Sequence, residues 1–531
     1  MQNSKKIKWN DFGSHYKYIF QNDVPKYHHR WVDGVRTIGS WSIIAFHYIF
    51  LICCFSKKEE IKVVRGFSFF KYFLNLDVAV DLFFILTGYL ISYRFFQEED
   101  SSKNQNNRKR DQNQEKEKEN EKEKENEKEN EKENEKENEK ENEKENEKEK
   151  ENEKEKIKKP LIVRCYEKLN KHYSFNYLLR RLLHLYPFLY FRLILSTGVL
   201  MGKFEPQTFG ILCIIFFMND YLPLIGWMPI GLSWTMSVEM KTYFSILLIR
   251  KYLEKANSSF IKILIKLFFL SLGLIFLLTI VNPKFWLYDR TTVLLSDLIF
   301  DHVSIKTGKI IFPIYGEERL SKQSLTVYYY TGFHFRVPVI ICGAFLSYLV
   351  LKTNLKRKLQ SSFQLNMLWF LASLGLVLCQ FLIRTSNLYA NLDPNTLGHL
   401  QKLLYRLPIF HRIIFAFGVC GIFFMVINQI GLVGRWCRKI LELKCWLPFS
   451  KLSYITYLMH HEVLKASVYL IKRRQYQVGE ITLFVFFFGL IGSYIVTYLV
   501  STVCYVFFIR PVATFIPRRL SSSSLSSKKN K

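Results

Sequence analysis

Long apolar segments, separated by short polar and basic stretches, recur along almost the whole chain. Each has about the 17 to 25 residues that a helix needs to cross the hydrocarbon core of a bilayer. About ten spans are predicted, near 37–56, 73–96, 176–200, 232–252, 259–281, 336–352, 366–384, 408–430, 448–471 and 480–509. Another apolar segment, 207–224, contains Asn219, Asp220 and Pro223, so it is either an eleventh span or a re-entrant segment.

The fold class predicted from this pattern is all-α, a polytopic integral membrane helix bundle with about 10–11 transmembrane helices. The first two spans and the later ones would form one functional domain that an insert interrupts. The expected segments are a cytosolic N-terminal segment 1–35, the first two spans in 36–96, the insert 97–175, the remaining spans in 176–512 and a basic, Ser-rich tail 513–531.

The insert contains a run, 115–156, that consists only of 21 Glu, 13 Lys and 8 Asn. Residues four apart in this repeat carry like charges, which does not favour a stable single helix. The composition is typical of disordered, solvated segments. We therefore expect no catalytic role for the insert.

Composition supports a membrane protein, with 49% hydrophobic and 16% aromatic residues and a net charge of +29. These values exclude a small soluble domain, a disulfide scaffold and a globally disordered chain. The basic residues form short clusters between apolar segments, as in cytosolic loops. A nucleic-acid partner is not expected, because such proteins gather basic residues on a soluble face. The ten Cys show no metal-ligand spacing, so no metal is predicted.

Charge distribution also predicts an orientation. Residues 1–35 are polar and basic, so the first span is expected to direct insertion with the N-terminus in the cytosol. If 207–224 is re-entrant, both termini and the basic clusters at 250–251, 352–358, 435–439 and 518–519 fall on the cytosolic side. If 207–224 spans, the sides after it invert. The loop with Lys57, Lys58, Lys62, Arg65 and Lys71 is the exception, because it would face outward.

The first span contains Arg36 and His47, eleven residues apart. On a helix this separation is about three turns, or about 16 Å, and leaves both side chains near one face. Ionisable groups inside the membrane usually face a cavity or another helix. A neutral His there could act as a general base, or it could be a structural hydrogen-bond partner between helices.

Three later spans contain further charged groups at helical spacing. Asp77 and Asp81 share a face at i,i+4, and they could orient a His, bind a cation or pair with Arg. The third span begins with a basic cluster that could bind phosphates or simply anchor the helix at the cytosolic surface. Around 232–252, Glu239 and Tyr243 share a face, and a salt bridge of Glu239 to Lys241 or to an Arg of another helix is the simpler alternative to a functional role. The third-span cluster comprises Arg180, Arg181 and His184, and Ser237 is a further candidate near Glu239.

Five blocks of this chain resemble, in order, the motifs of the acyltransferase-3 family. They are RWVDGVRTIGSWSIIAFHY, with that family's Arg-x10-His signature, LDVAVDLFFILTGYLI, RRLLHLYP, SWTMSVEMKTYF and LPFSKLSYITYLMHHEVL. A sixth block, FRVPVIICGAFLSYL, is similar to the eukaryotic branch that includes the nose resistant to fluoxetine proteins. Together the blocks cover residues 30 to about 512 apart from the insert.

The resemblance implies a membrane enzyme that moves an acyl group, commonly acetyl, from acyl-CoA to a hydroxyl of a carbohydrate or lipid acceptor. It implies that Arg36 and His47 are the essential pair and that Glu239 is the acid of the SVE motif. It also implies that the basic third-span motif meets the CoA phosphates. This motif maps onto Arg180, Arg181 and His184, where His184 replaces a second Arg, and the family's late His maps onto His460, with His461 adjacent.

The mechanism expected from these assignments uses His47 as the general base that deprotonates the acceptor hydroxyl. Arg36 would stabilise negative charge on the donor or in the transition state, and Glu239 or Asp81 would orient a cation or the imidazole. The alternative function is a membrane transporter of lipids or small hydrophobic molecules without catalysis, since intramembrane charges also suit a translocation path. A catalytically inactive scaffold is a third alternative. The host membrane is expected to be an endomembrane or the plasma membrane.

Overall fold

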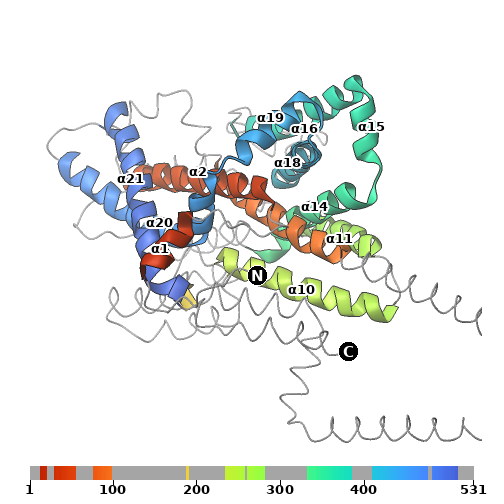
Figure 1. The fold of residues 1–531 in the computed structure, drawn as a ribbon, viewed down its shortest axis with the longest axis horizontal. Coiled ribbons are helices and arrows are strands. Elements are labelled where there is room, and N and C mark those ends of the chain that lie inside the picture. The colour runs from red at the N-terminus through yellow and green to blue at the C-terminus, as the bar shows by residue number, and fades with distance from the viewer. Residues whose placement is uncertain are drawn as a thin grey trace, which may run out of the picture. The chain divides into compact units, whose positions relative to one another are not determined.

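The computed structural model describes residues 12–20, 29–55, 76–97, 187–189, 220, 234–256, 260–281, 332–385, 410–475 and 481–511. Regular structure within these ranges is helical, and no strand occurs in them. This confirms the all-α prediction (Figure 1). All of these residues except Arg94–Gln97 belong to one compact unit, whose internal contacts are described below.

Each predicted span that falls within the described ranges coincides with a helix, whereas 176–200 and 207–224 lie outside them apart from 187–189 and Asp220. The helices are α1 (Phe12–Phe20), α2 (Arg30–Phe55), a helix at Leu76–Gln97 that begins with η1 (Leu76–Val78), α10 (Trp234–Ala256), α11 (Phe260–Val281), α14 (Phe333–Lys352), α15 (Leu355–Ser361), α16 (Phe363–Thr385), α18 (His411–Asn428), α19 (Gly431–Leu441), α20 (Trp446–Gln475) and α21 (Leu483–Cys504), which continues into the π-helical segment η6 (Tyr505–Ile509).

Six of these helices are long and apolar enough to cross a membrane, so the protein is an integral multi-pass membrane protein. A seventh candidate is the pair α15 and α16, which bends by 114° at Ser362. Helices α10 and α20 also coincide with predicted spans, but charged and polar side chains lower their apolar character. The total of about ten spans stays a prediction. The six helices are Arg30–Ile52, Leu76–Gln97, Phe260–Leu277, Phe333–Lys352, His411–Asn428 and Leu483–Ile509.

The spans differ in how far their neighbours cover them. The most apolar stretch of α18 is 78% buried and that of α2 is 67% buried, whereas the values for α11 and α21 are 28% and 22%. The exposed side chains of α11 and α21 are largely Phe, Leu, Ile and Val. Lipid tails can solvate such side chains, so α2 and α18 are central and α11 and α21 are lipid-facing.

Helices α2 and α20 pack side by side and run in the same direction. Ser450, near the start of α20, donates a hydrogen bond of 2.7 Å to Asp33 near the start of α2. Further along, His460 lies against His47. Helix α21 runs the opposite way, because Tyr48 donates to the carbonyl oxygen of Phe486 near its start. An apolar cluster of Ile44, Tyr48, Leu464, Phe486 and neighbouring side chains fills the space between the three helices.

The helix at 76–97 crosses α14 very closely. A Cβ at Gly88 would overlap the carbonyl oxygen of Ile340, and a Cβ at Gly343 would overlap that of Ile85. Small residues let two backbones approach in this way, which favours helix association inside a membrane. Because this crossing fixes the two helices, it also fixes the charged side chains that they contribute to the site.

Candidate functional site

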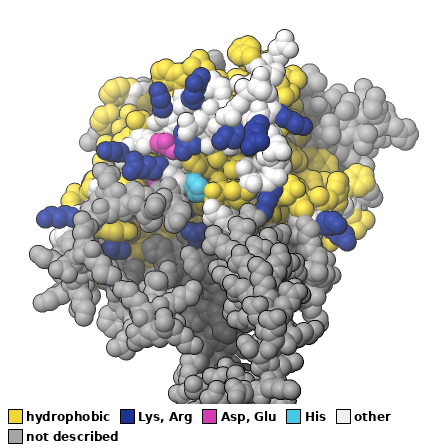
Figure 2. All heavy atoms as spheres, turned by 45° about the vertical axis from the view of Figure 1, so that its right-hand side comes forward, with side chains coloured by type: hydrophobic (Ala, Val, Ile, Leu, Met, Phe, Trp, Pro, Cys, Tyr) yellow, Lys and Arg dark blue, Asp and Glu magenta, His cyan; other side chains and the backbone are white. Residues whose placement is uncertain are grey.

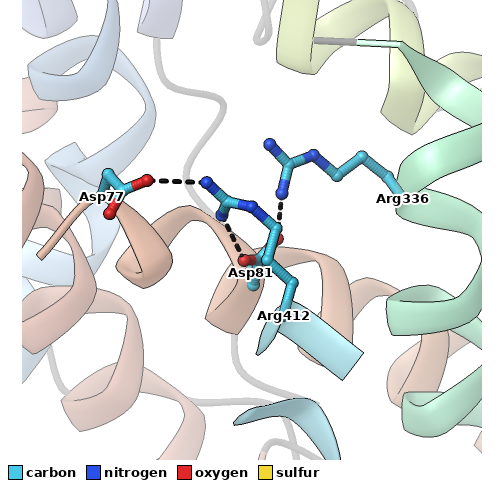
Figure 3. A network of polar contacts seen from close by, with 4 residues as sticks. All are labelled: Asp77, Asp81, Arg336 and Arg412. Atoms are coloured by element: carbon cyan, nitrogen blue, oxygen red, sulfur yellow. Dashed lines mark hydrogen bonds and ion pairs between the residues drawn. The ribbon is translucent and has the colours of Figure 1, made fainter. Parts of the chain in front are cut away.

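Four charged side chains form a buried carboxylate–guanidinium cluster of Asp77, Asp81, Arg336 and Arg412 (Figure 3). Arg336 donates to one oxygen of Asp81 at 2.7 Å, and Arg412 donates to the other at 2.6 Å. Arg412 also reaches Asp77 at 2.6 Å. Both oxygens of Asp81 are therefore engaged, and three helices are joined through one carboxylate.

The charges of the cluster balance one another in a buried surrounding. Asp81 and Arg336 are fully buried, and Asp77 and Arg412 are nearly so. Two carboxylates facing two guanidinium groups leave no net charge, and their attraction and short hydrogen bonds offset part of the cost of burying ions. The Arg336 guanidinium also lies 5.3 Å from the centre of the Trp234 ring, so α10 contributes a cation–π contact.

The cluster also sets the directions of α14 and α18. Arg336 and Arg412 lie in the first turns of their helices, and both bind the same carboxylate. The two helices therefore start at one end of the bundle and run in parallel to the other end. The helical segments α15 and α19, which follow them in the chain, lie at that other end.

A second arrangement is the histidine pair of His47 and His460, which are 413 positions apart in sequence. The Nε2 atom of His460 lies 3.1 Å from Nδ1 of His47, and the ring centres are 4.9 Å apart. His460 is buried and His47 is half-buried. His461 lies close as well, with its ring centre 6.1 Å from that of His47. The structure thus distinguishes the two adjacent histidines, because only His460 hydrogen-bonds His47.

Backbone carbonyls determine which ring nitrogens hold the protons. Nδ1 of His460 lies 2.7 Å from the carbonyl oxygen of Tyr457, so this nitrogen is the donor and Nε2 is the acceptor. Nδ1 of His47 lies between the carbonyl oxygen of Ile43, at 3.0 Å, and the accepting Nε2 of His460. Nδ1 of His47 must then be protonated, which leaves the lone pair on Nε2. Among the described residues, nothing hydrogen-bonds to this Nε2.

The two arrangements are neighbours. Leu76 packs against the apolar cluster that contains Ile44 and Tyr48, so the start of the helix at 76–97 lies beside the His47 region of α2. Asp77 follows Leu76 in this segment and pairs with Arg412. The carboxylate–guanidinium cluster therefore begins beside the part of α2 that carries His47.

Arg36 lies on the same continuous helix as His47 and is half-buried. Eleven residues of α-helix separate the two by about 16 Å along the axis. This separation confirms the predicted helical spacing. It is too long for the two side chains to contact the same atom of a small substrate.

Helix α10 positions two acidic groups. Glu239 is half-buried and accepts a hydrogen bond of 2.8 Å from Tyr243, which confirms the shared face. Lys241 pairs with Asp220 instead of Glu239. Asp220 also accepts from Ser237 at 2.7 Å and from the backbone N–H of Phe333, the first residue of α14. An anion at this position satisfies a free N–H group and stabilises the helix start.

Of the three roles considered for Asp77 and Asp81, the structure shows pairing with Arg. The predicted phosphate-binding residues Arg180, Arg181 and His184 lie outside the described residues. Sequence reasoning did not select Arg336 or Arg412, although a single Arg in the first turn of an apolar span is itself a signal of a paired or functional charge.

Comparisons of the chain with protein-family models, with curated proteins and with solved structures found no match. In the part of the chain that the structure describes, no group of three or more His, Cys, Asp or Glu side chains could hold a metal ion.

Proposed function

We propose that this protein is a membrane O-acyltransferase that moves an acyl group from acyl-CoA to a hydroxyl of a carbohydrate or lipid acceptor. The main support is the histidine pair, in which His460 and Ile43 hold Nδ1 of His47 and leave the Nε2 lone pair available. A neutral imidazole with a fixed tautomer presents a lone pair that can take a proton from a hydroxyl. The resemblance of the sequence blocks to acyltransferases points to the same residue.

In this proposal Nε2 of His47 takes the proton of the acceptor hydroxyl as its oxygen attacks the thioester carbonyl carbon. A C–O bond forms and the C–S bond breaks. The imidazolium then returns the proton to the departing sulfur, which leaves as the free thiol of CoA. The buried His460 keeps the ring in place during both proton transfers, because its Nε2 accepts from Nδ1 of His47.

Arg36 is proposed to bind the acyl donor, acyl-CoA, at a point away from the reacting carbonyl. Its distance from His47, about 16 Å along α2, suits an elongated donor that contacts both residues at different points. The guanidinium would bind a negatively charged part of acyl-CoA. Arg180, Arg181 and His184 are proposed to bind the CoA phosphates. The Asp81 carboxylate, with both oxygens held by Arg, is assigned a positioning role through Arg412 and Asp77.

The experiment that tests this function uses washed membranes containing wild-type protein or His47→Ala, incubated with labelled acetyl-CoA. The expected result is label in lipid or glycan with the wild type and a loss of at least 100-fold in the variant. The fraction that gains label identifies the acceptor class. Absence of both transfer and acyl-CoA binding by the wild type would contradict the proposal.

A transporter of lipids or small hydrophobic molecules is the second candidate. The observation that favours it is the carboxylate–guanidinium cluster, because buried ion pairs also occur along translocation paths. The two functions differ in their need for acyl-CoA. Movement of a labelled lipid between leaflets of reconstituted vesicles, equal with and without acyl-CoA, would favour the transporter.

A further inference from the structure

Helix α19 lies across one end of the bundle rather than along it. At its start, a Cβ on Gly431 would overlap the side chain of Asn366 on α16. In its middle, Gly434 packs against the backbone of Met425 on α18, and at its end Leu441 lies against Gly34 on α2. Three helices that traverse the membrane are therefore capped by one short helix, as expected for a helix in the plane of the interface.

The inner side of α19 is held by polar contacts as well as by packing. Arg438 donates a hydrogen bond of 2.6 Å to the carbonyl oxygen of Ile427, near the last turn of α18, and pairs with Glu442 at 2.8 Å. The turn into α19 uses left-handed backbone at Gln429 and at Gly431. These contacts fix which side of α19 faces away from the bundle.

The outer side of α19 combines an apolar stripe with basic side chains. Leu432, Trp436 and Ile440 recur every four residues and are 66%, 60% and 48% exposed. Arg435 and Lys439 are also exposed and lie next to the stripe on the helical wheel. Lys439 is 6.0 Å from the centre of the Trp436 ring. An apolar stripe flanked by Lys or Arg, with Trp, is characteristic of helices at a membrane surface.

Helix α15 extends this surface. It ends at Ser361, a few residues before Asn366, which contacts the start of α19. Its Lys356, Arg357 and Lys358 are all exposed. Figure 2, which brings the α15 side of the molecule forward, shows Lys and Arg side chains gathered beside an apolar surface. We call the exposed side chains of α15 and α19 the interfacial surface.

We infer that the interfacial surface binds the anionic phospholipid headgroups of the leaflet that borders this end of the bundle. Exposed Leu432, Trp436 and Ile440 enter the boundary between headgroups and acyl chains. The five basic side chains of α15 and α19 lie at the level of the lipid phosphates. The occupant is a lipid surface because the stripe and the positive charges match its apolar and anionic layers side by side.

The test measures the stabilisation of detergent-purified, full-length protein by added phosphatidylserine, with phosphatidylcholine as the neutral lipid. Phosphatidylserine should raise the thermal midpoint of the wild type more than phosphatidylcholine does, and added salt should reduce the difference. The variant R435Q/K439Q should bind phosphatidylserine about 30-fold more weakly, so its midpoint should respond less to this lipid. Its charge-conserving counterpart, R435K/K439R, should behave like the wild type and shows whether the site tolerates substitution.

The matched control is K262Q/K266Q, which removes two exposed lysines at the same i,i+4 spacing from α11. This control should keep the response to phosphatidylserine. Equal weakening by the control would overturn the assignment to the interfacial surface, because the effect would then be one of total charge. An unchanged response of R435Q/K439Q, or equal stabilisation by the two lipids, would also overturn it.

Discussion

The carboxylate–guanidinium cluster and the histidine pair are neighbouring polar regions with different properties. In the cluster, both oxygens of Asp81 are bound by Arg336 and Arg412, and every member is buried. In the histidine pair, one nitrogen of half-buried His47 has no hydrogen bond among the described residues. A carboxylate with both oxygens bound by Arg from two other helices holds helices together, whereas a ring nitrogen with an available lone pair can accept a proton.

The largest loss of stability is expected for Asp81→Asn. This change leaves the buried Arg336 and Arg412 with reduced charge compensation, which costs about 3–5 kcal/mol. The thermal midpoint of purified protein and the yield of monodisperse protein measure it. Asp77→Asn is the control and should cost less, because Arg412 keeps its bond to Asp81. If Asp81→Asn were as stable as the wild type, the cluster would not be needed to hold the helices together.

The close crossing of the helix at 76–97 with α14 is expected to be the next most sensitive feature. Gly88→Ala places a methyl group against the carbonyl oxygen of Ile340, which should cost about 1–3 kcal/mol through displacement of the helices. Gly273→Ala on α11 is the matched control, since no atom lies within 4 Å of its Cβ position. The thermal midpoint of Gly88→Ala should be clearly lower than that of Gly273→Ala. Equal thermal midpoints would contradict the close contact between the helix at 76–97 and α14.

His460→Ala should affect activity more than stability. It removes the acceptor of the Nδ1 proton of His47, a hydrogen bond of ~1 kcal/mol, so transfer should fall by about 5-fold. His461→Ala provides a control, because His461 is adjacent in sequence but makes no hydrogen bond to His47. Initial rates of label transfer at equal protein amounts give the comparison. Equal losses for both variants would mean that the tautomer of His47 is not set by His460.

The smallest effect is expected for Tyr243→Phe. The variant loses one hydrogen bond to the half-buried Glu239, worth about 1 kcal/mol or less where a partly accessible carboxylate can be solvated instead. The thermal midpoint should therefore shift only slightly. A large fall in the rate of transfer with an unchanged thermal midpoint would instead place Glu239 in the catalytic site together with the histidine pair.

The fold could be predicted from sequence because lipid permits so few backbone arrangements. A span must satisfy its own hydrogen bonds, so apolar length alone indicates a helix. The spacing of Arg36 and His47 and the shared face of Glu239 and Tyr243 followed from the period of that helix. Both are local properties, and the structure confirms them.

The contacts between helices could not be predicted in the same way. No local pattern shows that His460 and not His461 meets His47, since the choice depends on the rotation of α20 against α2. The partners of Asp81 lie 255 and 331 positions away in sequence, on two other helices. Lys241 likewise pairs with Asp220 and not with nearby Glu239, because Asp220 lies at the start of α14.

The measurement that tests the central claim most directly is the rate of acyl transfer from labelled acetyl-CoA by purified, reconstituted His47→Ala. The amount of folded protein is matched to wild type by the thermal transition. The account predicts a rate lower by about 10²–10⁴-fold for equal amounts of folded protein, because the general base is lost. A folded His47→Ala protein that transfers the acyl group at the wild-type rate would contradict the account.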